Sequence, residues 1–303
     1  MNSSLTAIAT SANSRMKNAP TMNVLPEREM TSEQYIRLRD LIYQKLGLFF
    51  EDSKVYFIKR RVERRLAALQ LDRVDEYIFY LRFSDENGRE MQELANLITT
   101  NETYMFREYE QLEAFSNHCL PEILEAKRKR GDRCLRIWSA GCSSGEEPYT
   151  LAIILREVIA NIADWEIEIV ASDVDSNMLR SVEAANYGER SVKDVPEQYF
   201  DRHLICNGAS YQVRPETKRL VRACHLNLHD RLSMRAMRGF DFIFCRNVLI
   251  YFDDASRKSV VDHFYSALNA GGYIFLGHSE SIGRISSAYT LVRRGNYLTY
   301  QKL

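Results

Sequence analysis

The chain has 303 residues, in which 41 Lys and Arg residues balance 41 Asp and Glu residues. This length suffices for two domains with a sizeable core, and the charge balance gives no sign of a nucleic-acid-binding or membrane-surface protein. The six cysteines show no CxxC or Cys/His ligand spacing, which predicts reduced thiols and no metal site. No apolar run is long enough to span a membrane, and the N-terminus lacks a signal-peptide core. We expect a cytoplasmic protein without membrane insertion.

The first hundred residues predict a polar leader followed by a small helical domain. Residues 1–28 are rich in Ser, Asn, Ala and Thr without an apolar period, which is typical of a disordered leader. Residues 29–100 show helical periodicity, beginning with a capping box of Thr31 and Gln34. Gly47 is placed to end that first helix. The following helices are expected at Asp52–Leu69, Val74–Phe83 and Gly88–Ile98.

The second of these helices carries a basic face. At 100° per residue, Arg60 and Arg64 point away from the apolar stripe, and Arg61 lies on its flank. Such a face is either a solvated surface or a docking surface for an acidic partner helix. The charges alone leave both interpretations open.

A strand, a glycine turn and a helix are predicted over Leu135–Leu155. Gly141 and Gly145 allow a sharp turn and a close approach of the backbone to a ligand. The turn continues into Glu146 and Glu147, which would repel a pyrophosphate, so the expected ligand is neutral or cationic and carries hydroxyl groups. The alternative is that the two glutamates only complement the helix dipole.

An acidic residue follows the next predicted strand, Glu166–Ala171. Asp173 lies 28 positions beyond Gly145, the spacing at which dinucleotide-type folds place a carboxylate on the ribose hydroxyls. The glycine turn and the acid together therefore predict an α/β domain that binds a nucleoside-containing ligand.

The remaining chain continues this α/β pattern. Thr99–Arg107 mixes polar and aromatic residues at the junction between the two domains. This composition fits either a ligand site or an ordinary loop. Residues 187–222 suggest an antiparallel insertion with a turn at Gly208–Ser210, which either binds a partner or covers the sheet edge. Its strands are expected at Tyr211–Arg214 and Arg219–Arg222. Further elements are expected as helices at Tyr109–Lys129, Met178–Ala185 and Ala255–Leu268, and as strands at Phe240–Cys245, Tyr273–Leu276, Tyr289–Val292 and Asn296–Tyr300.

Two further positions lie directly after predicted strands. Arg246 and Asn247 follow the apolar strand Phe240–Cys245, at the sheet edge where open α/β sheets bind ligands. His278 follows another strand, where a hydrogen-bonded structural histidine and a catalytic one are both compatible with the sequence.

Five motifs in this order resemble the CheR family of chemotaxis-receptor glutamate methyltransferases: TTNETYMFRE, WSAGCSSGEEPY, ASDVD, FCRNVLIYFD and GHSE. The resemblance implies a class I, Rossmann-like S-adenosylmethionine-dependent methyltransferase domain over 101–303, with a small antiparallel β-subdomain, after an all-α N-terminal domain. It implies methylation of specific glutamates on the cytoplasmic helical bundle of chemoreceptors, giving glutamate methyl esters and S-adenosylhomocysteine. A methyltransferase with another substrate and a non-catalytic cofactor-binding module are the alternatives.

The resemblance also implies the site residues. Apart from the resemblance, we expect Arg107 and Tyr251 to orient the substrate; for Arg107 the alternative is that it balances the carboxylate of the cofactor. We also expect a monomer. The partner surface is expected at Arg60, Arg61 and Arg64. The cofactor contacts are expected at Asn101, Thr103, Arg107, Gly141, Glu147, Asp173, Asn227, Leu228, Arg246 and Asn247.

Overall fold

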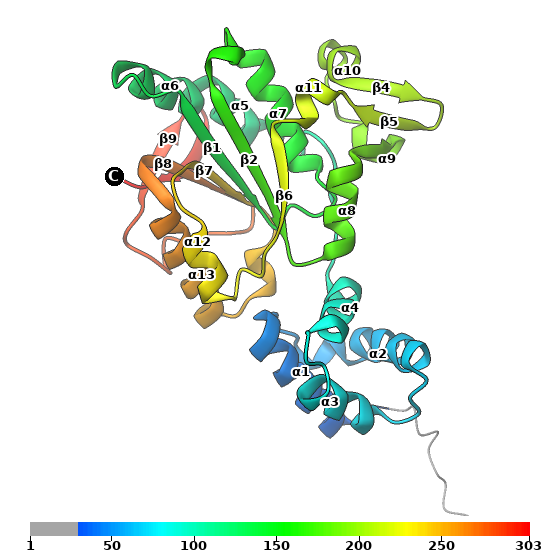
Figure 1. Ribbon diagram of the computed structural model, residues 1–303. Coiled ribbons are helices and arrows are strands. Elements are labelled where there is room, and N and C mark those ends of the chain that lie inside the picture. The colour runs from blue at the N-terminus through cyan, green and yellow to red at the C-terminus, as the bar shows by residue number, and fades with distance from the viewer. Residues whose placement is uncertain (1–29) are drawn as a thin grey trace, which may run out of the picture.

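The computed structural model describes residues 30–303; the leader predicted over residues 1–28 lies outside this range. Figure 1 shows a group of helices from the N-terminal part of the chain below a mixed β-sheet that is flanked by helices on both sides. Within residues 30–303, no helix is long and apolar enough to cross a membrane.

The N-terminal helices form where the sequence predicts them. Thr31 and Gln34 make the capping box, and Gly47 ends the first helix with φ 73°. Leu38, Ile58 and other apolar side chains from all four helices pack into one buried cluster. The helices are α1 (Ser32–Leu46), α2 (Val55–Leu69, after a 3₁₀ turn at Asp52–Lys54), α3 (Val74–Phe83) and α4 (Arg89–Ile98).

The sheet has seven strands in the order β6-β2-β1-β7-β8-β10-β9. The first five are parallel, and β10 is antiparallel to both of its neighbours. The strand order reverses between β1 and β7, which is where open α/β sheets bind their ligands. The strands are β1 (Cys134–Ala140), β2 (Glu166–Asp173), β6 (Val221–His225), β7 (Phe240–Cys245), β8 (Leu268–Leu276), β9 (Thr290–Arg294) and β10 (Tyr297–Gln301).

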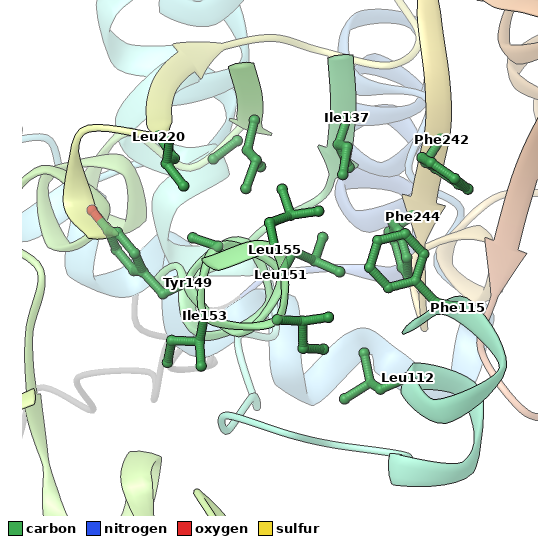
Figure 2. Packing of buried hydrophobic residues seen from close by; sticks show 14 of the residues in the cluster. Leu112, Phe115, Ile137, Tyr149, Leu151, Ile153, Leu155, Leu220, Phe242 and Phe244 are labelled. Carbon is green, nitrogen blue, oxygen red and sulfur yellow. The ribbon is translucent and has the colours of Figure 1, made fainter. Parts of the chain in front are cut away.

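Alternate residues of the central strands build two cores. On one face, Phe242 and Phe244 lie toward Phe115 and the apolar side of α7, as Figure 2 shows. On the other face, Trp138 packs edge-on against Phe264 of α13, with ring centroids 5.1 Å apart. The covering helices are α5 (Tyr109–Ala114), α6 (Leu120–Lys129), α7 (Glu146–Val158) and α8 (Ser176–Ala184) on the first face, and α12 (Arg231–Ala236) and α13 (Asp254–Ala267) on the second.

One expected helix is interrupted. The helix predicted over Tyr109–Lys129 is broken by a π-helical turn at Phe115–Cys119. The turn points the Phe115 ring at the sheet, where it packs edge-on against Phe242, Phe244 and Phe275. This aromatic contact gives the interruption a packing role that local periodicity does not reveal.

The insertion forms a three-stranded antiparallel sheet in the order β3-β5-β4. Its hairpin turn lies at Gly208, as predicted, but the expected pairing with Arg219–Arg222 is wrong. Val221 begins β6, which pairs in parallel with β2 at the edge of the large sheet, because its apolar residues pack on the main core. The insertion comprises β3 (Asn186–Gly188), α9 (Glu189–Val192), α10 (Glu197–His203), β4 (Leu204–Asn207), β5 (Ser210–Val213) and α11 (Pro215–Lys218).

The loop after α1 crosses to the sheet. Leu48 forms an isolated antiparallel bridge with Phe252, and the Phe49 N–H donates to the Tyr251 carbonyl at 2.9 Å. On α1 itself, the Tyr43 hydroxyl donates to Asp253 at 2.9 Å. These contacts place the helices beside the carboxyl ends of the central strands.

Candidate active site

A cavity of about 260 Å³ lies at the carboxyl edge of the sheet, with the loop after α1 forming one wall. Every residue that the sequence predicts for the cofactor or the substrate lines this cavity. These residues are Asn101, Thr103, Arg107, Gly141, Glu147, Asp173, Asn227, Leu228, Arg246, Asn247 and Tyr251. The predicted partner residues Arg60, Arg61 and Arg64 lie elsewhere, on α2.

The glycine turn needs both of its glycines. Gly141 has φ 75°, and a Cβ there would collide with the side chain of Val248. Gly145 has φ 101°, and a Cβ there would lie 2.7 Å from the Tyr187 hydroxyl oxygen. The Gly141 and Cys142 N–H groups both donate to the carbonyl of Ser172, at 2.8 and 2.9 Å. The turn therefore stays tightly packed between β1 and β2 beside the cavity.

Asp173 ends β2 with its side chain held by backbone groups. Its Oδ2 accepts the Ser143 N–H and its Oδ1 accepts the Asp175 N–H, both at 2.8 Å. Burial raises the pKa of this carboxyl, and the two N–H donors oppose the shift. A carboxylate offers about four acceptor positions, so lone pairs remain for hydroxyl groups of a ligand in the cavity.

Glu147 lies in the first turn of α7 and is also anchored. Its Oε1 accepts the Ser139 hydroxyl at 2.7 Å, and its Oε2 lies 3.3 Å from Nη1 of Arg246. Burial raises the pKa of Glu147, and Arg246 counters that shift. A buried carboxylate with a raised pKa is stabilised by any positive charge that a ligand brings.

Arg246 lies in the cavity wall with its side chain 5% exposed. Its Nη2 donates to the Arg107 carbonyl at 2.6 Å and lies 3.2 Å from Oε2 of Glu108. Asn247 has φ 59°, and its N–H donates to Glu280 at 2.8 Å. The guanidinium of Arg246 is therefore engaged by the chain itself.

The segment from Asn101 to Arg107 covers the cavity from the other side. The Asn101 amide donates to Asp175 at 2.9 Å. Nη1 of Arg107 donates to the Glu102 carbonyl at 3.1 Å, and the guanidinium lies 5.8 Å from the centre of the Tyr104 ring. The Asn227 amide donates to the Lys45 carbonyl at 2.8 Å, so α1 fixes its orientation.

The sequence did not reveal several residues of this region. Asp175 caps α8 and accepts from Thr99 and Asn101, and its position before Ser-Asn-Met is a recognisable N-cap signal. Glu280 accepts the N–H groups of Asn247 and Gly277, which assigns a contact to the GHSE motif. No local pattern pointed to Phe49 and Ile250, which line the cavity and are each 49% exposed. His278 is exposed and does not line the cavity.

The arginines of α2 divide into two kinds. Arg61 donates to the Leu97 carbonyl at 3.1 Å and lies over the Phe57 ring. Arg60 and Arg64 are exposed. Among the described residues, no group of His, Cys, Asp and Glu side chains could hold a metal ion.

Comparison with known proteins assigns both parts of the chain. Residues 33–99 match the family described as CheR methyltransferase, all-alpha domain, and residues 101–297 match CheR methyltransferase, SAM binding domain. The chain belongs to the CheR family. It is 40% identical over 274 residues to chemotaxis protein methyltransferase 2 of Vibrio cholerae, covering 90% of this chain and 94% of that protein. It is 31% identical to the chemotaxis protein methyltransferase of Escherichia coli, covering 86% and 89%.

Among solved structures, the chain is similar to the N-methyltransferase NodS from Bradyrhizobium japonicum in complex with S-adenosyl-l-homocysteine. The TM-score is 0.34 at 13% identity, over 57% of this chain and 80% of that one.

The cofactor of this CheR methyltransferase is S-adenosylmethionine, and the site fits it. The cofactor has two ribose hydroxyls, a sulfonium and an ammonium group. Asp173 lines the cavity and keeps acceptor positions beyond its two N–H partners, and Glu147 has a pKa raised by burial that a positive ligand would lower.

Proposed function

We propose that this CheR methyltransferase transfers the methyl group of S-adenosylmethionine to glutamate side chains of chemoreceptors, as a protein-glutamate O-methyltransferase. The observation that carries the proposal is a pair of carboxylates, the buried Asp173 and the largely buried Glu147, in a cavity that Arg107 also lines. The products are a glutamate methyl ester and S-adenosylhomocysteine. Similarity to chemotaxis protein methyltransferases over most of the chain supports the choice of receptor as substrate.

The cofactor supplies an electrophilic methyl group on a positively charged sulfur. Asp173 would accept hydrogen bonds from the ribose, and Glu147 would attract the positively charged groups of the cofactor. The cavity is also lined by Asn101, Thr103, Gly141, Asn227, Leu228, Arg246 and Asn247. The last four of these residues would lie on the adenosine side of the cofactor. Together these residues align the methyl group for attack from the open side of the cavity.

The receptor glutamate attacks through a carboxylate oxygen, and Arg107 and Tyr251 orient it. The new bond joins that oxygen to the methyl carbon while the bond from the methyl carbon to sulfur breaks, so a carboxylate and a sulfonium become a neutral ester and a neutral thioether. A glutamate is already ionised at pH 7, so the step needs no strong general base. Alignment and partial desolvation of two opposite charges drive the transfer.

The receptor lies against the basic face of α2, where Arg60, Arg61 and Arg64 meet acidic side chains of the cytoplasmic helical bundle. Arg60 and Arg64 are exposed, whereas Arg61 is partly held by the Leu97 carbonyl. We propose that the enzyme works as a cytoplasmic monomer.

The test is methyl transfer from labelled S-adenosylmethionine to purified cytoplasmic receptor fragments from the same cell. Base-labile label on receptor glutamates is the expected result, and Asp173→Ala serves as the cofactor-site control. Label that survives base would indicate a different acceptor group. Cofactor binding by calorimetry without any transfer would contradict the enzymatic assignment and favour a binding module.

A further inference from the structure

The segment that carries Arg107 has an unusual backbone. Phe106 has φ 60° and Glu108 has φ 56°, on either side of Arg107. Left-handed values are unfavourable for residues with a side chain, because Cβ approaches the following carbonyl oxygen. Such a conformation persists where neighbouring groups hold it in place.

Two hydrogen bonds hold the first half of this segment. The Met105 N–H donates to the Ser191 carbonyl in the insertion at 2.8 Å. The Phe106 N–H donates to the hydroxyl of Thr150 on α7 at 3.0 Å. These contacts hold Met105 and Phe106, and neither is made by the backbone of Arg107.

Arg246 holds the second half. Its Nη2 donates to the Arg107 carbonyl at 2.6 Å and lies 3.2 Å from Glu108, whose side chain is 19% exposed. On its other side, Nη1 lies 3.3 Å from Glu147. The guanidinium is thus a buried cation between two carboxylates, one in the cavity wall and one in the Arg107 segment.

Helix capping does not explain the Glu108 side chain. Glu108 occupies the N-cap position of α5, yet its side chain makes no capping hydrogen bond. The carboxylate is instead directed at Arg246. Glu108 Oε2 is buried without a hydrogen-bond partner, so its contact with Arg246 is an ion pair. The attraction of the guanidinium to Glu108 opposes its attraction to Glu147.

We propose that Glu108 is a positioning residue for methyl transfer: it holds Arg246 against the Arg107 carbonyl and thereby fixes the Arg107 side chain at the cavity. The inference rests on the role proposed above for Arg107. Without the Glu108 charge, the guanidinium moves toward Glu147, the hydrogen bond to Arg107 is lost, and the Arg107 side chain is misplaced.

The test compares Glu108→Gln with Glu110→Gln. Both variants remove one negative charge from the start of α5, but Glu110 is exposed and does not contact Arg246. We expect Glu108→Gln to lower kcat/KM for a receptor fragment about tenfold to a hundredfold, since a displacement of 1 Å can have that effect. Glu110→Gln should stay within about twofold of the unmodified enzyme. Thermal unfolding of both variants shows whether the fold is kept. If Glu108→Gln unfolds, Glu108→Asp replaces it in the test, and this variant should retain part of the activity because it keeps the charge.

A double-mutant cycle with Arg107→Ala separates positioning from general damage. If Glu108 acts through Arg107, its substitution has no further effect once Arg107 is alanine. Equal losses in both backgrounds would overturn the inference, as would equal behaviour of Glu108→Gln and Glu110→Gln. If the unmodified protein labels no receptor, the proposed function fails separately. The same cycle is then measured on the Kd of S-adenosylmethionine. A loss of affinity on Glu108→Gln that occurs only in the protein that retains Arg107 supports the inference, and equal losses with and without Arg107 overturn it.

Discussion

The two edges of the parallel sheet each bury an aspartate, and the two aspartates are used differently. At the amino edge, Asp241 is 3% exposed and accepts from Lys127, Asn269 and the Arg136 N–H. At the carboxyl edge, Asp173 is 7% exposed, accepts two backbone N–H groups and borders the cavity. A buried acid paired with a cation of the chain is structural, whereas one held by backbone groups at a cavity retains acceptor positions for a ligand.

The pKa directions follow the same division. At the amino edge, burial raises the pKa of Glu168, but hydrogen bonds from Arg222 and Arg136 outweigh it and leave that pKa below its ordinary value. At the carboxyl edge, burial raises the pKa of both Asp173 and Glu147. At the amino edge the arginines outweigh burial, whereas at the carboxyl edge burial outweighs the partners of the two carboxyls, including Arg246 beside Glu147. A positively charged ligand would therefore stabilise both ionised carboxylates.

Replacing Asp173 with alanine tests the binding edge and should have the largest effect. Two hydrogen bonds to a charged acceptor contribute about 1.5–3 kcal/mol each, so we expect cofactor affinity to fall about a thousandfold. Calorimetry with S-adenosylmethionine measures the affinity of the folded variant. Urea unfolding should show a loss of about 1–3 kcal/mol, because alanine leaves the Ser143 and Asp175 N–H groups without their acceptor. Unchanged affinity would contradict the assignment of Asp173 to the ribose.

Replacing Asp241 with alanine should lower the stability and leave cofactor binding unchanged. The change leaves the ammonium of Lys127, whose side chain is 6% exposed, without one of its two carboxylate partners. Breaking a buried ion pair costs about 3 kcal/mol of the free energy of unfolding. Urea unfolding measures this loss, and the cofactor affinity of the folded variant should match that of the unmodified protein. If Asp241→Ala instead lowered the affinity for S-adenosylmethionine without loss of stability, Asp241 would act in binding and the two edges would not differ in the way described.

The sequence predicted the local part of this arrangement. Capping by Thr31, the stop at Gly47 and the strand Phe240–Cys245 depend on neighbouring residues or on a short period, and the structure has all three. The place of Asp173 at the end of its strand followed from the predicted strand Glu166–Ala171 just before it. These features depend on residues that are close in the sequence, so they can be inferred without knowing the tertiary contacts.

The contacts that complete the site join distant segments. The bridge of Leu48 to Phe252, the contact of Arg246 with Glu108 and the parallel pairing of Val221 with β2 each depend on packing of the whole chain. The wrong pairing predicted for Arg219–Arg222 has this origin, because a short apolar run fits either sheet until its neighbours are placed.

Lowering the pH tests the carboxyl edge, because the pKa values of Asp173 and Glu147 are raised. A cationic cofactor stabilises the ionised carboxylates and so lowers their pKa, and binding therefore releases protons. We expect the affinity to fall about tenfold as the pH drops from about 7 to 5. Calorimetry in two buffers of different ionisation enthalpy counts the protons. Glu147→Gln should reduce that count, and Asp241→Ala should not; no proton release in the unmodified protein would contradict the expectation.

The same distinction applies within α2 and gives the smallest expected effect. Arg65 is paired with Glu90 by two hydrogen bonds of 2.8 and 2.7 Å, whereas Arg60 and Arg64 are exposed. Exposed charges act mainly on encounter with a partner, so Arg60→Glu with Arg64→Glu should raise KM for an acidic receptor fragment about fivefold at low salt. The effect should shrink as salt screens the charges, while kcat and cofactor affinity stay unchanged. The matched control is Arg219→Glu with Arg235→Glu, which makes the same charge change at two exposed arginines near the amino edge. An equal rise in KM for both pairs would show that net charge, and not the face of α2, governs receptor encounter.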